Sequence, residues 1–345
     1  MKKILAVLAL VFACLWGTAF AADFSHLIIL HTNDTHGYDQ RADGVNGMAT
    51  VAALKEDYEA KGYKVLLVDA GDAIQDNNLV NFSKGKTAID FMNAVGYDAM
   101  TLGNHEFDYG PDVTMERIKQ AKFPIVSANI IVEATGKPFT GKTHAIIRKG
   151  DLKIGVFGLT TPSTITTSNP KSTRGLTFLS KEEMYAAAQK EVAALKAAHC
   201  DLIVAIGHLG SEPDAVGDRS NDVLANVKGI DVFIDGHSQS TVEMKQVKDK
   251  AGNTVVLSQT GSYFAAIGEM TIAANGTITT KLVKEYEGSD ATVAALQKTW
   301  MDKVEGMLGE KIAETDIEFT IKGKGKYKDD NDKNVSVPDV DVRIK

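Results

Sequence analysis

Metal-capable side chains recur in five short polar segments, each of which directly follows an apolar run. The segments read HTNDTHG, DAGD, GNHEFDYG, GHLG and DGHSQ. They supply imidazole, carboxylate and amide groups, which suit Zn, Mn, Fe or Co ions better than they suit a thiolate site. One such segment alone carries little weight, because polar loops of this composition are common. Five of them after five apolar runs indicate one shared site.

The apolar runs have the length and composition of buried strands, and stretches with helical spacing lie between several of them. In open α/β sheets, ligands bind in the crevice beyond the carboxyl ends of the strands. Glycines beside the polar groups allow sharp turns and close convergence of side chains. We therefore expect the five segments to meet at one sheet edge. The runs are 27–30, 65–68, 99–102, 202–206 and 232–234.

A pair of divalent ions is the chemistry that such a ligand set favours. Two ions about 3.5–4 Å apart can activate a water molecule and clamp both ends of an in-line displacement. One carboxylate should bridge them. Phosphoryl transfer fits this arrangement, since it needs mainly positioning and neutralisation of charge from the protein.

The rest of the chain continues the alternation of helices and strands. Ser180 and Glu183 predict a capping box that opens a long helix toward His199. A helix over 292–312 reads as a linker, and the alternating sequence at 335–344 predicts a strand. The other expected elements are helices at 48–60, 87–95 and 112–121, strands at 125–128, 254–257 and 269–272, and a hairpin of 144–147 with 153–159 around the turn 149–151.

Composition sets limits on the class of protein. The 345 residues carry a formal net charge of −7, which argues against a general nucleic-acid-binding surface. The hydrophobic fraction of 44% is typical of a globular protein. Once the leader described next is removed, Cys200 is the only cysteine, so neither an intramolecular disulfide nor a thiolate metal site is expected.

The first residues have the pattern of a secretory signal. Lys2 and Lys3 precede an apolar run at 4–16, and 19–21 reads AFA, which predicts cleavage after Ala21. The run is short for a membrane-spanning helix, which needs about 20 residues. We therefore expect a periplasmic or secreted protein without stable membrane insertion. Acylation at Cys14 is the alternative, although the residues before it match a lipobox poorly.

In order and spacing, the five segments resemble those of the bacterial 5′-nucleotidase and UDP-sugar hydrolase family, within the calcineurin-like metallophosphoesterase superfamily. The resemblance covers roughly residues 27–319 and includes KIGVFGLTTP and SQTGSYFAAIGEM. It implies an α/β fold, a four-layer αββα metallophosphoesterase sandwich in which helices flank two mixed sheets. It also implies two divalent metal ions of the Zn, Mn, Co or Fe type.

The resemblance also implies roles for individual residues. His105 would approach the scissile phosphate and stabilise its developing charge, and Asp108 would orient His105. Glu106 receives no metal role and is interpreted as structural. The implied ligands are Asp34, His36 and Gln239 for the first metal, Asn104, His208 and His237 for the second, and Asp72 as the bridge.

Glutamine at position 239 indicates which branch of the family the chain resembles. Many metallophosphoesterases have GHxH in the fifth motif. In this chain residues 236–239 read GHSQ, so glutamine stands in place of the second histidine. That variant resembles the UDP-sugar hydrolase branch. It makes the first site less basic without selecting a metal.

The domain organisation implied by the resemblance has a missing part. We expect a signal peptide at 1–21, a catalytic domain at 22–288, a linker helix at 289–315, and a stub at 316–345 that precedes an absent C-terminal nucleotidase domain. In the family, that domain carries an aromatic pair for the nucleobase and arginines for phosphate. A missing segment or a separate chain would supply it, and the alternative is a free-standing enzyme with broad phosphoesterase activity.

The implied function is hydrolysis of 5′-nucleotides, in nucleotide catabolism, by in-line attack of a metal-bound water. The partner would be a nucleotide or small phosphoester, and not a nucleic acid polymer. Three alternatives keep the site but change the substrate to a 2′,3′-cyclic nucleotide, a UDP-sugar or a sulfur ester. A non-catalytic binding protein is a further alternative, against which the intact ligand set argues.

Overall fold

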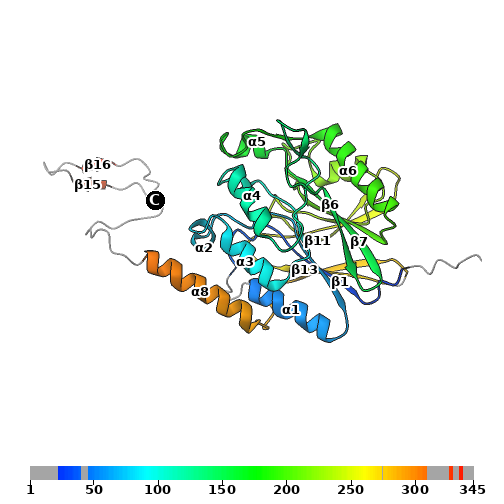
Figure 1. Cartoon of the computed structure of the whole chain (residues 1–345), viewed down its shortest axis with the longest axis horizontal. Coiled ribbons are helices and arrows are strands. Elements are labelled where there is room, and N and C mark those ends of the chain that lie inside the picture. The colour runs from blue at the N-terminus through cyan, green and yellow to red at the C-terminus, as the bar shows by residue number, and fades with distance from the viewer. Residues whose placement is uncertain (1–21, 40–45, 274, 309–325, 329–333, 337–345) are drawn as a thin grey trace, which may run out of the picture. The chain divides into compact units, whose positions relative to one another are not determined.

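A computed structural model describes residues 22–39, 46–273, 275–308, 326–328 and 334–336 (Figure 1). The predicted signal peptide, Cys14 and most of the predicted stub lie outside these residues. The chain divides into two compact units, one ending at Val304 and the other beginning at Glu305.

The first large sheet has five strands in the order β14-β13-β1-β2-β3. β1 is parallel to β2, and β2 is parallel to β3, while β13 runs antiparallel to both β1 and β14. The sheet is therefore mixed, as expected. The strands are β1 (Leu27–Thr32), β2 (Lys64–Asp69), β3 (Ala99–Met100), β13 (Ile267–Ile272) and β14 (Ile278–Val283).

The second large sheet has six strands in the order β11-β12-β10-β9-β7-β6. The four central strands are parallel to one another, and the two edge strands are antiparallel to their neighbours. The strands are β6 (His144–Lys149), β7 (Leu152–Thr160), β9 (Leu202–His208), β10 (Val232–Ile234), β11 (Thr241–Lys248) and β12 (Thr254–Thr260). A smaller sheet joins β4 (Ile130–Val132), β5 (Lys137–Pro138) and β8 (Leu176–Phe178).

The two large sheets pack face to face between helices. Along β1, Leu27 and Ile29 share a core with Val204 and Ile206 of β9. The alternate residues of β1 face a second core with helices α1 (Met48–Ala60) and α3 (Lys86–Val95). Because side chains alternate across a strand, each sheet buries both faces.

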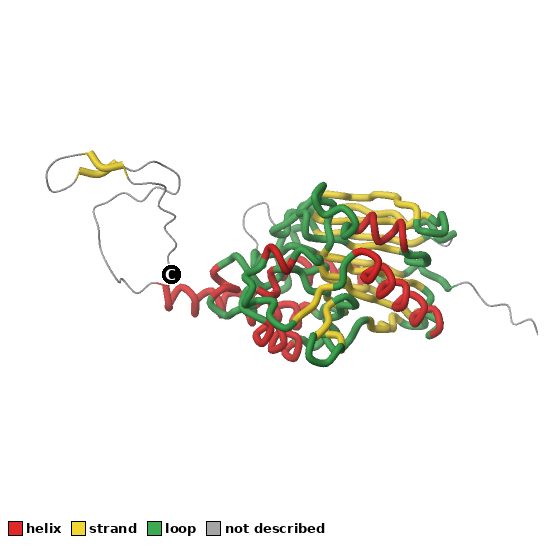
Figure 2. Tube along the Cα trace, turned by 90° about the horizontal axis from the view of Figure 1, so that it is seen from above, coloured by secondary structure: helices red, strands yellow, loops and turns green. Residues whose placement is uncertain are grey.

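The outer face of the second sheet is covered in the same way. Ile203 and Ala205 of β9 pack in a third core with α6 (Lys181–Ala197) and α7 (Ser220–Asn226). Figure 1 shows α1 and α3 on one side and α6 on the other. Figure 2 shows the strands lying side by side with helices packed along them. The fold class predicted from the sequence, a layered α/β sandwich of mixed sheets, is confirmed.

The remaining helices are mostly short. Helix α8 (Ala291–Leu308) agrees with the predicted linker helix up to its last described residue, and its Val293 and Val304 join the core beside α1 and α3. Among the described helices, none is both long enough and apolar enough to cross a membrane. The others are α2 (Asn78–Asn81), the 3₁₀ helix η1 (His105–Phe107), α4 (Pro111–Gln120) and α5 (Thr164–Thr167).

The predicted strand at 125–128 is wrong. Ile125 makes only an isolated parallel bridge to Met100. The Val126 amide donates to the Met100 carbonyl in the first sheet, whereas the Ala128 amide donates to the Gly158 carbonyl in the second. The segment crosses from one sheet to the other, so its backbone groups cannot form a continuous ladder with either.

The capping box predicted at Ser180 and Glu183 is also wrong, although α6 does begin at Lys181. The Ser180 side chain makes no capping hydrogen bond. Instead, the Lys181 amide donates to Asp218 Oδ1 at 2.8 Å. The Glu183 amide, which a capping box would bond to the Ser180 side chain, donates to the Ser180 carbonyl, and a side chain distant in sequence accepts from the first amide of the helix.

The second unit contains a short hairpin among its described residues. β15 (Lys326–Lys328) pairs antiparallel with β16 (Asn334–Ser336), and Tyr327 lies opposite Val335. The strand predicted at 335–344 overlaps β16 at its first two residues, and the rest of it lies outside the described part. Its partner β15 was not predicted, because the polar composition around it favours a loop.

His31 of β1 offers a test of the core by pH. It is fully buried, and burial lowers its pKa to about 3. An unfolded imidazole has a pKa of about 6.5, so between these values the unfolded chain binds a proton that the folded chain does not. The neutral His31 therefore makes its full contribution to the free energy of unfolding above pH 6.5. Between pH 6.5 and 3 that contribution falls by about 1.4 kcal/mol for each pH unit.

We expect His31→Leu to reduce the slope of unfolding free energy against pH between pH 6.5 and 4, as measured by denaturant titration. His26→Leu, at an exposed position, controls for the loss of one imidazole. An unchanged slope in His31→Leu would contradict the burial argument.

Candidate active site

Two overlapping groups of ligand atoms form where the strands end. Asp34 and His36 follow β1, and Asp72 follows β2. His208 is the last residue of β9, and His237 follows β10. Ligand atoms of Asp34, His36 and Asp72 lie within 4.8 Å of one another, and so do those of Asp72, His208 and His237. Asp72 belongs to both groups, the position that the sequence assigned to a bridge.

The Asp72 carboxylate reaches both groups. Its Oδ2 atom lies 3.0 Å from Nε2 of His208 and 3.9 Å from Nε2 of His36. Its Oδ1 atom accepts a hydrogen bond from the His105 backbone amide at 2.8 Å. Oδ2 therefore faces the imidazoles, while Oδ1 ties the carboxylate to the backbone of the segment GNHEFDYG.

His208, of the second group, and Asn104, of the segment GNHEFDYG, each have a polar atom that is suited to bind a cation. Nδ1 of His208 lies 2.7 Å from the Ala70 carbonyl, which requires Nδ1 to carry the proton and turns Nε2 toward Asp72. In the described part of the chain, Asn104 Oδ1 is buried and accepts no hydrogen bond. A buried oxygen without a donor is costly, and a metal ion would satisfy it. The residues present thus fit a metal site.

Five of the seven predicted ligands have left-handed backbone conformations. A positive φ is uncommon outside glycine and costs about 1–3 kcal/mol per residue unless the surroundings enforce it. Such strain clusters at functional sites. The φ values are 48° for Asp34, 50° for His36, 60° for Asp72, 74° for His237 and 51° for Gln239.

Two glycines allow the motifs to approach each other. A Cβ atom on Gly103 would lie 2.2 Å from Asp72 Oδ1. A Cβ atom on Gly236 would lie 2.8 Å from Nδ1 of His208. Both distances are shorter than van der Waals contact, so any larger residue would displace a candidate ligand.

Glu106 holds two of the motifs together. Its Oε2 atom accepts from the backbone amides of Gly103 at 2.5 Å and Asp72 at 2.8 Å, and its Oε1 atom accepts from Ala73 at 2.7 Å. These contacts agree with the structural role given to Glu106. No local pattern predicts which backbone amides Glu106 binds.

His105 and Asp108 form a pair at the edge of the cluster. Nδ1 of His105 lies 2.7 Å from Asp108 Oδ2. Burial alone lowers the pKa of His105, but the hydrogen bond to Asp108 and the charge of Asp72 outweigh it and raise the pKa to about 9. About a third of the His105 side chain is exposed, and its ring centroid lies 5.3 Å from that of His36.

The electrostatics of the cluster favour a cation. Burial raises the pKa of Asp34 to about 7, against the opposing charge of His208. Burial also opposes ionisation of Asp72, but His208 outweighs it and lowers that pKa. Burial lowers the pKa of His208, yet Asp72 and Asp34 raise it to about 10. The carboxylates therefore need positive charge beside them, which bound cations would also supply.

Gln239 lies at the solvent edge of the first group. It is exposed, and its Nε2 atom is 3.1 Å from Nε2 of His36. Asp69 and Asp235, two further acids at strand ends, serve the turns instead. Asp69 accepts from Thr32 and the Gly71 amide, and Asp235 accepts from the amides of Leu209 and Gly210.

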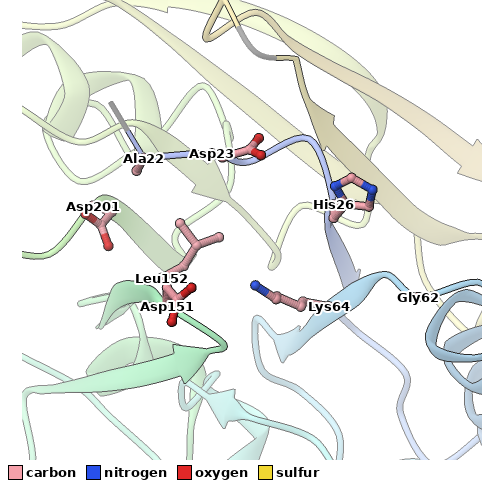
Figure 3. A pocket seen from close by; sticks show the side chains of 8 residues that line it. All are labelled: Ala22, Asp23, His26, Gly62, Lys64, Asp151, Leu152 and Asp201. Atoms are coloured by element: carbon pink, nitrogen blue, oxygen red, sulfur yellow. The ribbon is translucent and has the colours of Figure 1, made fainter. Parts of the chain in front are cut away.

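A cavity of about 490 Å³ lies at the other edge of the sheets, lined by residues at the amino ends of β1, β2, β7 and β9 (Figure 3). Lys64 extends into it toward Leu152 and Asp151. None of the candidate ligands lines it, so it is separate from the cluster. The lining residues are Ala22, Asp23, His26, Gly62, Lys64, Asp151, Leu152 and Asp201.

Comparison with known families agrees with this geometry. Residues 27–240 match the model of the calcineurin-like phosphoesterase family. The chain belongs to this family. The match begins at β1 and ends just beyond Gln239, so it contains all the candidate ligands and the His105–Asp108 pair. The matched region is therefore a domain of the metal-dependent phosphoric ester hydrolase type.

Within this family, the chain is similar in sequence to 5′-nucleotidases. The 5′-nucleotidase of Vibrio cholerae is 37% identical over 231 residues, which are 64% of this chain and 41% of that protein. The 5′-nucleotidase of Bos taurus is 37% identical over 232 residues, 62% of this chain and 38% of that protein. The chain thus spans about two fifths of the length of these relatives.

Solved structures share the fold. A 5′-nucleotidase precursor from Thermus thermophilus is similar with a TM-score of 0.72 and 28% identity, covering 82% of this chain and 59% of that one. The calcineurin-like phosphoesterase YfkN from Bacillus subtilis has a TM-score of 0.68 at 24% identity, covering 83% of this chain and 99% of that one. The second likeness supports the fold alone.

The close approach at Gly103 gives a prediction about metal binding. We expect Gly103→Ala to push Asp72 out of place and to weaken Mn²⁺ binding at least tenfold, measured by isothermal titration calorimetry. Gly306→Ala is the matched control, because a Cβ atom there has no atom within 4 Å. Equal Mn²⁺ affinity in Gly103→Ala and the wild type would show that a Cβ atom at position 103 does not displace Asp72.

Proposed function

We propose that the chain is a dinuclear metal-dependent hydrolase that releases phosphate from 5′-nucleotides. The observation that carries the proposal is the pair of ligand groups that share Asp72. Family membership and the 5′-nucleotidase relatives support the reaction class and the substrate class.

The proposed metal ligands are the seven residues predicted from the sequence. When bound, two divalent ions supply Lewis-acid stabilisation and activate a nucleophile at neutral pH. Imidazole, carboxylate and amide donors suit Zn, Mn, Co or Fe. The first ion would take Asp34, His36 and Gln239, the second would take Asn104, His208 and His237, and Asp72 would contact both.

His105 has the properties needed to stabilise a phosphoryl group during transfer. Its Nδ1–H bond to Asp108 fixes the ring, and the same hydrogen bond raises its pKa and favours the protonated imidazole. A proton at Nε2 can then donate to an oxygen on which negative charge develops. Asp108 acts through His105 and is a positioning residue.

The substrate specificity of the complete enzyme is part of the proposal. The chain spans 41% of the Vibrio cholerae relative, so further sequence in that protein has no counterpart in the matched region. We propose that residues 22–288 form the catalytic domain, that 289–315 form a linker, and that 316–345 begin a substrate domain.

The leader sequence supports a periplasmic or secreted location for the same activity. Export would place the enzyme where nucleotides can be dephosphorylated outside the cytoplasm. N-terminal sequencing of the purified protein would test the location of cleavage, which is proposed after Ala21.

Two substitutions separate metal binding from catalysis. Asp72→Ala is expected to lose both bound metal and hydrolysis, since both groups lose a ligand. His105→Ala is expected to keep both metals while turnover falls about 10²–10⁴-fold, the range typical of a positioned acid–base group. Metal content is measured by elemental analysis, and turnover by phosphate release from AMP in Mn²⁺, Co²⁺ and Zn²⁺.

The same assay uses UDP-glucose, a 2′,3′-cyclic nucleotide and p-nitrophenyl phosphate to define the substrate class. Asp151→Ala, in the cavity at the opposite sheet edge, is the control and should retain turnover. Full turnover by His105→Ala would refute its role, and a metal-loaded wild type inactive on every phosphoester would refute the proposed function.

A further inference from the structure

Two tyrosines form an exposed aromatic pair beside the first ligand group. The ring centroids of Tyr38 and Tyr263 are 4.6 Å apart, and the rings are tilted by 55°. Tyr38 is 40% exposed and Tyr263 is 37% exposed. Because aromatic rings in contact usually lie in a core, a pair left accessible on this scale is available to a ligand.

The pair is the outer end of a row of rings that starts at the proposed catalytic histidine. The ring centroid of His36 lies 5.3 Å from that of His105 and 5.3 Å from that of Tyr263. Tyr38 in turn lies against Tyr263, with the ring centroids 4.6 Å apart. A phosphoester with its phosphoryl group near His105 could thus extend its other end over the two tyrosines.

Tyr263 is held by the site itself. Its backbone amide donates to the Asp34 carbonyl at 2.8 Å. Burial raises the pKa of its hydroxyl, and the Asp76 carboxylate near it raises that pKa further. Tyr263 has a φ of 57° and the adjacent Phe264 has a φ of 56°, while Phe264 is buried at 2% exposure. The buried neighbour anchors a strained turn that presents Tyr263 outward.

A ring fixed in advance binds an aromatic group at a lower entropic cost than a mobile one. Stacking on aromatic side chains accepts any base, because every base has a π-face. The pair therefore suits the flat group of a nucleotide or aryl phosphate, and it offers nothing comparable to an alkyl phosphate.

We propose that Tyr38 and Tyr263 form a stacking platform by which the catalytic domain itself favours phosphoesters with an aromatic group. The inference rests on the proposed function, since the platform acts only on a substrate whose phosphate is held at the metal cluster. It names a specificity element within residues 22–288, separate from any substrate domain.

The test compares one aromatic and one alkyl substrate. For Tyr38→Ala we expect kcat/KM for AMP, divided by kcat/KM for glycerol 3-phosphate, to fall about tenfold, equivalent to about 1.4 kcal/mol. The fall should lie in KM, because stacking contributes to binding of the ground state and transition state alike. Tyr38→Phe keeps the ring and should keep the ratio.

Ile146→Ala is the matched control, because it removes an apolar side chain that is 41% exposed on β6. It should leave kcat/KM unchanged for both substrates. Adenosine and ribose, used as inhibitors of glycerol 3-phosphate hydrolysis, give a second readout: Tyr38→Ala should weaken inhibition by adenosine alone.

An equal change for both substrates in Tyr38→Ala, or no change for either, would overturn the platform while leaving the proposed function intact. If the wild type hydrolyses neither substrate, the proposed function fails instead. Calorimetric titration with AMP then decides the platform: weaker binding to Tyr38→Ala supports it, and equal binding overturns it.

Discussion

The convergence of buried acids and imidazoles on Asp72 is the constraint that the rest of this fold serves. A carboxylate buried among others is stable only beside positive charge, and here His208 supplies it from 3.0 Å away. Maintaining that contact requires Gly103 next to Asp72, Glu106 across two turns, and strained backbone at the ligands. The strained backbone costs stability, and it persists because these features together hold the Asp72–His208 contact.

The two sheets share the site. Asp34, His36 and Asp72 follow strands of the first sheet, whereas His208 and His237 follow strands of the second. The apolar core between the sheets therefore sets the separation of the two ligand groups. Ile29 and Val204 lie in that core, five residues before Asp34 and four residues before His208, so their packing positions the strand ends that carry these ligands.

Much of this architecture could be predicted from the sequence, because buried strands and amphipathic helices have strong local patterns. Met48–Ala60 and Val232–Ile234 agree with the predicted ranges to the residue. The order of the motifs also predicted which side chains would lie together. Their roles as metal ligands stay a prediction that the proposed assays address.

What could not be predicted depends on partners distant in sequence. The segment at 125–128 looks like a strand locally, but its amides bond to two different sheets. Asp218 accepts from the first amide of α6, and Glu106 accepts from amides more than 30 residues away. The Tyr38–Tyr263 contact joins residues over 200 positions apart, which no local pattern encodes.

The segment that crosses between the sheets has a thermodynamic consequence. Since Val126 and Ala128 bond to opposite sheets, neither sheet can separate without breaking these bonds and pulling the two ligand groups apart. Any ion that binds only the assembled groups adds RT ln(1 + [L]/Kd) to the free energy of unfolding. Bound metal would thus raise the free energy of unfolding of both sheets together, a structural contribution in addition to its proposed chemical one.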